Sequence, residues 1–178
     1  MNPVSLQLVH NLLVILLFTF SSGPQTITDQ GFSIKEATID NLQLAFKHNQ
    51  LTSRQLVQFY LVEITRLNPF LKGVIEMNPD ALDLVEKADY ERKTKPPFVP
   101  LSKLHAIPIL VKDNTATKGK LNTITGSYAL LGSVVPRDAR VVTKLREAGA
   151  IILGKASLSE WSNWRSNSAP SGGSGTGD

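Results

Sequence analysis

Two short apolar runs on either side of an amphipathic segment constrain the fold of this chain more than any other feature. Residues 107–111 (Ile-Pro-Ile-Leu-Val) and residues 150–154 (Ala-Ile-Ile-Leu-Gly) are apolar on both faces, as expected for strands that are covered on two sides. The segment between them includes a helical pattern over residues 138–148. A strand, a helix and a strand in this order predict a right-handed parallel βαβ unit.

The ends of the connecting helix can be predicted from single residues. Asp138 is a good opening residue. Gly149 suits the position after the last turn, because glycine readily adopts the left-handed conformation that ends many helices. The expected apolar face consists of Val141, Val142, Leu145 and Ala148.

Helical patterns also precede the first run. Thr52 and Gln55 form a capping box that opens one helix, which is expected to end at Asn68-Pro69. Asn78 is expected to cap another helix, with Pro79 at its first position, and residues 73–76 between them are expected to form a short strand. The first helix of the series has its apolar residues at Ile39, Leu42 and Phe46.

These elements predict an α/β fold that combines an N-terminal helical layer with a parallel βαβ unit. The chain has 178 residues, about the length of one ordinary domain. We assign residues 24–95 to the helical segment and residues 101–170 to a partial α/β domain, with a Pro-rich linker at residues 96–100. Residues 171–178, rich in Gly and Ser, are expected to form a flexible tail.

The first 23 residues resemble a secretory signal peptide. Residues 12–20 are apolar, and small residues suited to signal peptidase follow at 21–24. The run is too short to span a bilayer, for which ~20 apolar residues are needed, so a removed leader is expected rather than a stable membrane anchor. A buried N-terminal helix or an uncleaved signal anchor is the alternative. The expected address is therefore the secretory pathway or the cell exterior.

Composition excludes several classes of function. The chain has no Cys, which excludes disulfides, Fe–S clusters, thiolate metal sites and a Cys nucleophile. Its 19 Lys and Arg are interleaved with 15 Asp and Glu, so no basic stripe points to nucleic acid. His10, His48 and His105 lie far apart in the sequence without a metal-binding motif, and no metal site is expected.

Lys112 occupies a position where ligands often bind. It directly follows the first apolar run, and open α/β sheets bind ligands beyond the carboxyl ends of their parallel strands. Apolar walls around a lysine lower its pKa and allow the neutral amine to act as a base. The connection 113–136 is long, which is typical of functional loops. Position alone does not distinguish such a base from an exposed lysine at the end of a strand.

Residues 104–114 (Leu-His-Ala-Ile-Pro-Ile-Leu-Val-Lys-Asp-Asn) closely resemble a motif of the amidase signature family, G-x-P-x-x-x-K-D-N, in which the Lys is catalytic. The resemblance continues through residues 36–39, 51–53, 121–130 and 145–161. It identifies the chain as similar to this family, and the leader suggests the plant-type secreted branch. By this resemblance, Lys112 is the expected catalytic residue.

The resemblance implies hydrolysis of a small-molecule or acyl amide by a Ser–cis-Ser–Lys triad. Lys112 would withdraw a proton through a bridging Ser while a second Ser attacks the amide carbonyl and forms an acyl-enzyme, which water then hydrolyses. Backbone N–H groups would stabilise the oxyanion. No metal or organic cofactor is implied.

The chain departs from the family pattern in two places. Ala106 stands where the pattern has Gly, which is harmless if its φ is negative and strained if it is positive. The family's Gly/Ser-rich signature, which carries both triad serines, lies well downstream of its Lys, and the 178 residues end before it. Ser171 and Ser174 lie among glycines but in the wrong place relative to Lys112, so neither is expected to be a nucleophile.

Other conspicuous residues are expected to be structural. Asp113 and Asn114 are expected to turn or cap the chain after the strand. Residues 157–160 match a capping box that is expected to open a last short helix, and Trp161 and Trp164 on this helix are expected to pack.

Three functions remain open. The chain is an amidase represented by its N-terminal portion and inactive alone, a non-catalytic truncated or interaction protein, or an amidotransferase A-type subunit that works with partner subunits. For the isolated chain we expect poor folding, because a partial sheet exposes an unpaired edge and apolar faces.

Overall fold

The computed structural model describes residues 32–164 and Ser168. The predicted signal peptide at 1–23, the tail at 171–178 and Ser171 and Ser174 lie outside these residues. The helices are α2 (Ile39–Lys47), α3 (Ser53–Leu71), α4 (Ala81–Thr94) and α5 (Arg140–Glu147), with short 3-10 helices η1 (Tyr128–Leu130) and η2 (Glu160–Asn163). The strands are β1 (Val74–Met77), β2 (Pro108–Lys112) and β3 (Ile151–Ala156).

The three strands form one sheet in the order β1-β3-β2. Strands β2 and β3 pair in parallel and are connected through α5, so the predicted βαβ unit and the α/β class are confirmed. Strand β1 pairs antiparallel to the other edge of β3. The sequence predicted this short strand but gave no indication of its partner.

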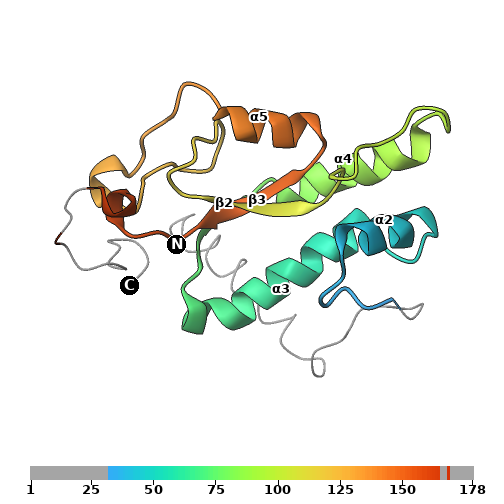
Figure 1. Cartoon of the computed structure of the whole chain (residues 1–178), viewed down its shortest axis with the longest axis horizontal. Helices are drawn as coiled ribbons and strands as arrows, with labels where there is room; N and C mark the ends of the chain where they lie inside the picture. The colour runs from blue at the N-terminus through green and yellow to red at the C-terminus, as the bar shows by residue number, and fades with distance from the viewer. Residues whose placement is uncertain (1–31, 165–167, 169–178) are drawn as a thin grey trace, which may run out of the picture.

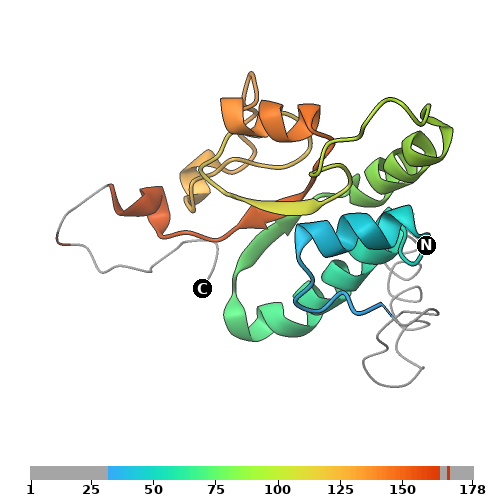
Figure 2. The same cartoon turned by 45° about the vertical axis from the view of Figure 1, so that its right-hand side comes forward.

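The helices cover the two faces of the sheet, with α5 on one side and α2 and α3 on the other (Figures 1 and 2). On the α3 side, Val57 and Val85 pack with Ile151 and Leu153 of the central strand. On the α5 side, Val142 packs against the sheet in a second buried cluster whose other members are Val111, Leu121 and Ile152. Strand β3 is thus buried on both faces, as predicted.

Strand β2 is less covered than its apolar sequence predicts. Val111 is buried, but Leu110 on the opposite face is 39% exposed. The cause is position, since β2 is an edge strand of the described sheet and only β3 is flanked on both sides. Val141 of α5 is exposed as well, because the helix contacts the sheet through Val142.

A β-bulge interrupts the pairing of the parallel strands. The register of β2 on β3 shifts after Ile109, which leaves Leu153 without a partner in β2. An extra residue of this kind reverses the alternation of side chains beyond it. Lys155 therefore shares a face with Val111, its register partner, whereas regular alternation would place it beside Ile151 among the helices α3 and α4.

The end of helix α3 differs from the prediction. Helix α3 continues through Pro69 to Leu71 and ends at Lys72, whose φ is +46°. Pro69 removes only the bond to the carbonyl of Thr65, an exposed residue that water can solvate. The side chain of Asn68 meanwhile donates to the carbonyl of Val74 at 2.7 Å and accepts from its N–H at 2.9 Å, which stabilises the turn into β1.

The starts of α4 and α5 also lie later than predicted. The N-cap of α4 is Asp80, because Asn78 accepts a hydrogen bond from the Asp80 N–H in a turn before the helix. The N-cap of α5 is Ala139, since the carboxylate of Asp138 accepts from the N–H of Lys118 in the preceding loop instead. At the other end, Gly149 has φ +77° and follows the C-cap Ala148, as predicted.

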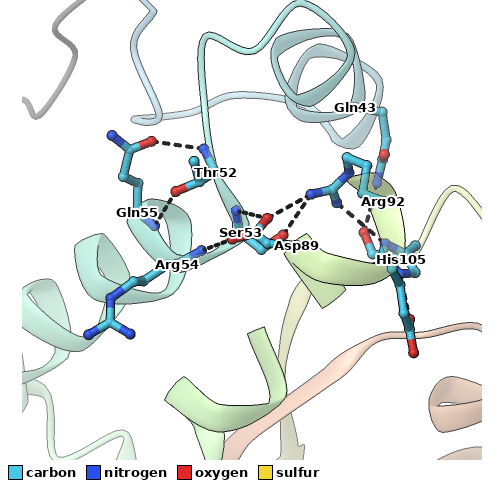
Figure 3. A network of polar contacts seen from close by, with 9 residues as sticks. Gln43, Thr52, Ser53, Arg54, Gln55, Asp89, Arg92 and His105 are labelled. Atoms are coloured by element: carbon cyan, nitrogen blue, oxygen red, sulfur yellow. Dashed lines mark hydrogen bonds and ion pairs between the residues drawn. The ribbon is translucent and has the colours of Figure 1, made fainter. Parts of the chain in front are cut away.

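A polar network joins the helical layer to the segment before β2 (Figure 3). The carboxylate of Asp89 accepts from the N–H groups of Ser53 and Arg54 at the start of α3. Arg92 donates to Asp89 and to the Ser53 hydroxyl, and its second nitrogen lies 3.3 Å from Nδ1 of His105. The predicted capping box of Thr52 and Gln55 is formed beside it.

The last described segment is only partly as predicted. Helix η2 is a short 3-10 turn whose N-cap is Ser159, without a side-chain capping bond, so the predicted start at Ser157 is wrong. The two tryptophans are also not buried: Trp161 is 43% and Trp164 is 90% exposed. Between residues 32 and 164, none of the helices is both long and apolar enough to cross a membrane.

Candidate active site

Lys112 is the last residue of β2, at the carboxyl end where the sequence placed it. Its side chain is exposed, and among the described residues the apolar walls expected around its ammonium group are not present. The carbonyl of Lys112 accepts a 2.8 Å hydrogen bond from the N–H of Thr115, which closes a tight turn directly after the strand. The structure thus fixes the backbone of Lys112 while its amine is open to solvent.

Asp113 organises the loop that begins at this turn. It is fully buried, and its carboxylate accepts from the N–H groups of Ile124 at 3.3 Å and Gly126 at 2.9 Å. Its own N–H donates to the carbonyl of Ala156 at the end of β3. Asp113 therefore has the structural role predicted for it, because it satisfies loop N–H groups that lie away from water.

Asn114 also makes a structural contact, since its side-chain amide donates to the hydroxyl of Ser162 at 2.9 Å. This bond joins the turn after β2 to η2, which follows β3. The prediction that Asn114 turns or ties the chain at this position agrees with that geometry.

A second lysine, Lys155 of β3, lies beside this loop and is completely buried. Its ammonium group donates to the carbonyl of Thr115 at 2.7 Å and to the hydroxyl of Thr123 at 3.1 Å. Burial lowers the pKa of Lys155 from 10.5 to about 8, although the charges of Asp113, Glu76 and Asp138 oppose this shift.

Sequence reasoning missed Lys155, although a signal was present. Both parallel strands end in an apolar run followed by Lys, so the argument that singled out Lys112 from its position applies equally to Lys155. The difference between one lysine that is exposed and one that is buried depends on the bulge at Leu153 and on the loop that covers Lys155, neither of which has a clear sequence pattern.

Ala106, which stands where the family pattern has Gly, has a strained backbone conformation. Its φ is +65° and its side chain is fully buried. The N–H of Ala106 donates to the carbonyl of Gly149 at 2.8 Å, which fixes the backbone where the chain enters β2. A left-handed conformation suits Gly and costs an alanine roughly 1–2 kcal/mol.

His105 is buried and structural, as expected. Its Nε2 lies 3.1 Å from Oε2 of Glu91. Its Nδ1 faces Arg92 (Figure 3). Burial lowers the pKa of His105, the bond to Glu91 raises it and the charge of Arg92 lowers it further. Within the described part of the chain, no three His, Asp or Glu side chains are grouped so that they could hold a metal ion.

An apolar pocket of about 420 Å³ lies between α3 and the sheet. Leu110 lines it, and because strand residues alternate, Leu110 and Lys112 point to the same face of β2. The loop held by Lys155 lies toward the opposite face, with α5. The pocket is otherwise lined mainly by Phe59, Tyr60, Ile64, Leu67, Leu71 and Val74.

A family model described as Amidase matches residues 55–175 of the chain. A protein named as a probable amidase of Arabidopsis thaliana is 54% identical over 162 residues, which cover 91% of this chain and 31% of that protein. The A-type subunit of the glutamyl-tRNA(Gln) amidotransferase of Exiguobacterium sibiricum is 33% identical over 135 residues, which cover 76% of this chain and 27% of that protein. The chain therefore spans about a third of the length of these relatives.

Two solved structures of amidases also match this chain. The X-ray structure of native peptide amidase from Stenotrophomonas maltophilia matches with a TM-score of 0.73 and 42% identity, over 80% of this chain and 29% of that chain. An amidase family protein from Bacillus anthracis matches with a TM-score of 0.72 and 35% identity, over 83% of this chain and 31% of that chain. The arrangement of α3, β1, β2, α5 and β3 is thus part of a larger fold that is already known.

Proposed function

Because this chain belongs to the amidase family, we propose that the protein hydrolyses carboxylic amides and that Lys112 is its catalytic base. The observation that carries the proposal is the position of Lys112 within residues 107–114, which match the family's strand-to-loop pattern in sequence and also form a strand and a tight turn. A lysine in this position has a fixed backbone and an amine that can reach a reacting group beyond the sheet.

In the proposed reaction, the neutral amine of Lys112 accepts a proton from a bridging serine, which accepts one from the nucleophilic serine. The nucleophile's oxygen bonds to the amide carbon, and the C–N bond breaks as the relay returns a proton to the leaving amine. Water then attacks the acyl-enzyme, and the carboxylic acid leaves with the serine restored. The substrate is a small-molecule or acyl amide.

The comparisons favour an amidase over an amidotransferase component. The relative named as an amidase is 54% identical to the chain, against 33% for the A-type subunit of the amidotransferase. The secretory address stays a prediction, and it depends on the apolar residues 12–20 and the small residues that follow them. The plant-type secreted branch is proposed on the same grounds.

Because the chain spans about a third of its relatives, the test supplies the remainder from one of them. The matching segment of the Stenotrophomonas peptide amidase is replaced by this chain's residues, and hydrolysis of primary amides is measured. We expect Lys112→Ala to lower kcat by about 10³-fold, the scale of a lost general base, and Lys118→Ala, an exposed lysine of the following loop, to leave it unchanged.

The 178-residue chain alone is assayed in parallel, and we expect no measurable turnover from it. Turnover by the chain alone that disappears in Lys112→Ala would contradict that expectation but support the role of Lys112. Equal activity of the hybrid enzyme with and without Lys112 would overturn the assignment of the base.

A further inference from the structure

Three charged side chains, two within strands and one directly after a strand, hold the same loop. Glu76 of β1 accepts from the backbone N–H of Asn122 at 2.8 Å and from its side-chain amide at 2.9 Å. Asp113, directly after β2, holds residues 124 and 126, and Lys155 of β3 holds residues 115 and 123. We call Glu76, Asp113 and Lys155 the charged clamp.

Lys155 is the central member of the charged clamp, because β3 lies between the other two strands. Its positive charge is flanked by the carboxylates of Glu76 and Asp113, with Asp138 as a third negative group, and these charges compensate part of the cost of its burial. The bulge at Leu153 is what turns this side chain toward the loop.

The loop depends on these bonds because it has little regular structure of its own. Between β2 and α5, the only helical segment that the structure describes is the three-residue turn η1. The charged clamp makes six hydrogen bonds to residues 115–126, and bonds to charged groups are stronger than those between neutral groups. The side chains of Leu121 and Ile124 are buried in the loop that results.

Thr115 connects the charged clamp to Lys112. Its N–H donates to the carbonyl of Lys112, and its own carbonyl accepts from Lys155. Thr115 is therefore hydrogen-bonded both to Lys155 and to the backbone of Lys112, so a displacement of Lys155 would displace the turn after Lys112.

We propose that Lys155 is a positioning residue, which fixes the turn after Lys112 by holding Thr115 and Thr123 against the sheet. This inference rests on the proposed function only in giving Lys112 a catalytic role. Lys155 itself does not contact substrate in this proposal. An ammonium group has three N–H donors and a neutral amine has two, so Lys155 can keep both bonds in either protonation state.

The first test measures backbone amide hydrogen exchange at pH 7 in the hybrid with the peptide amidase, in which the sheet of this chain is completed. Lys155→Met keeps an unbranched apolar side chain as far as Cε and removes the amine with both of its hydrogen bonds. We expect exchange at Thr115, Ile124 and Gly126 to become at least tenfold faster, while the amides of Ile151 and Leu153 in β3 keep their protection. Unchanged exchange at the loop amides would overturn the charged clamp.

Two further variants guard this test against misfolding and nonspecific effects. Lys118→Met removes an exposed lysine of the same loop and is expected to leave exchange unchanged. Thr123→Val removes the hydroxyl that accepts from Lys155 and, at 3.4 Å, from the N–H of Thr117. It should accelerate exchange at Ile124 and Gly126, which do not bond to that hydroxyl, even if Lys155→Met fails to fold. Faster exchange in Lys118→Met equal to that in Lys155→Met would count against a specific role for Lys155.

The second test follows the backbone ¹³C′ resonance of Lys112 by NMR at pH 7, because this carbonyl accepts the hydrogen bond from Thr115. We expect Lys155→Met to shift this resonance, since the turn closed by Thr115 loses its support, and Lys118→Met to leave it unchanged. Faster loop exchange with an unaltered Lys112 resonance would overturn the positioning role but leave the charged clamp. Neither measurement depends on amide hydrolysis, so failure of the proposed function would be seen separately.

Discussion

Ala106 shows how one methyl group can oppose the conformation that its neighbours impose. The N–H bond to Gly149 and the start of β2 hold the residue at φ +65°, where an alanine Cβ is crowded by its own backbone. The related family pattern has Gly at this position. The strain is local to a residue six positions before Lys112, in the segment that leads into the strand.

We expect Ala106→Gly to stabilise the chain by up to about 1 kcal/mol, because relief of roughly 1–2 kcal/mol of strain exceeds the loss of one buried methyl group, about 0.8 kcal/mol. Urea unfolding measures the change. Ala88→Gly removes a buried methyl group from helix α4 and should instead destabilise by about 1 kcal/mol or more. Destabilisation by both variants would show that residue 106 is not strained.

Sequence alone identified one of the two lysines at this end of the sheet. Lys112 belongs to a local motif, so its role could be proposed without knowing what surrounds it. Lys155 acquires its surroundings from residues far away in the chain, namely Glu76, Asp113 and the loop at 115–123. Burial of a charged group depends on such long-range contacts, which period-two patterns do not encode.

At the scale of the elements, the pairing of β3 with β1 depends on a close approach between their backbones at Gly154. A Cβ at Gly154 would lie 2.3 Å from the carbonyl oxygen of Glu76, so β1 and β3 can pair as they do only because this residue is Gly. The pairing also sets the position of the Glu76 side chain, which holds Asn122.

Gly154→Ala is expected to force β1 away from β3, to destabilise the chain by roughly 1–3 kcal/mol and to weaken the Glu76–Asn122 contact. Urea unfolding and the amide exchange of Asn122 measure the two effects. Gly73→Ala is the matched control, since its added Cβ would meet nothing within 4 Å. Equal stability of the two variants would contradict the close approach.

The existence of the elements was easier to predict than their ends. Apolar periodicity identified α3, α4, α5 and the strands, and it is a property of many residues together. The ends depend on single side chains with more than one possible partner: Asp138 binds the N–H of Lys118 instead of capping α5, and Asn78 forms a turn before α4. Pairing of β1 with β3 was not predictable because no local pattern specifies an antiparallel partner.

At the scale of the whole molecule, two buried bases make the free energy of unfolding depend on pH in the same direction. His105 and Lys155 both have a lowered pKa, chiefly because burial disfavours their charged forms. His105 faces Glu91, Arg92 and Lys95, and Lys155 faces Asp113, Glu76 and Asp138. In both cases the unfolded chain binds the proton more readily than the folded chain, so stability rises as pH rises.

For Lys155 we expect the free energy of unfolding to rise between about pH 8 and pH 10.5, by up to about 3 kcal/mol. This gain is complete above 10.5 and is lost as pH falls through about 8. For His105 the gain is complete above about pH 6.5 and is lost on further acidification. Urea unfolding of the hybrid with the peptide amidase from pH 5.5 to pH 10.5 measures both changes.

Single variants separate the two contributions. Lys155→Met should flatten the alkaline rise, His105→Gln should reduce the acidic loss, and Lys118→Met should alter neither. An alkaline rise that persists in Lys155→Met would assign it to another group.

Leu153, the bulge residue without a partner in β2, has a consequence for how insertions and deletions affect this protein. One additional residue in β3 reverses which face each later side chain takes, and so decides whether Lys155 faces the helices α3 and α4 or the loop beside α5. Loss of that residue would leave the composition of the strand almost unchanged, yet it would exchange the partners of Lys155 for an apolar layer. In this strand, residue count therefore carries information that residue type does not, and relatives that differ by a single-residue gap here need not place the same lysine in the same surroundings.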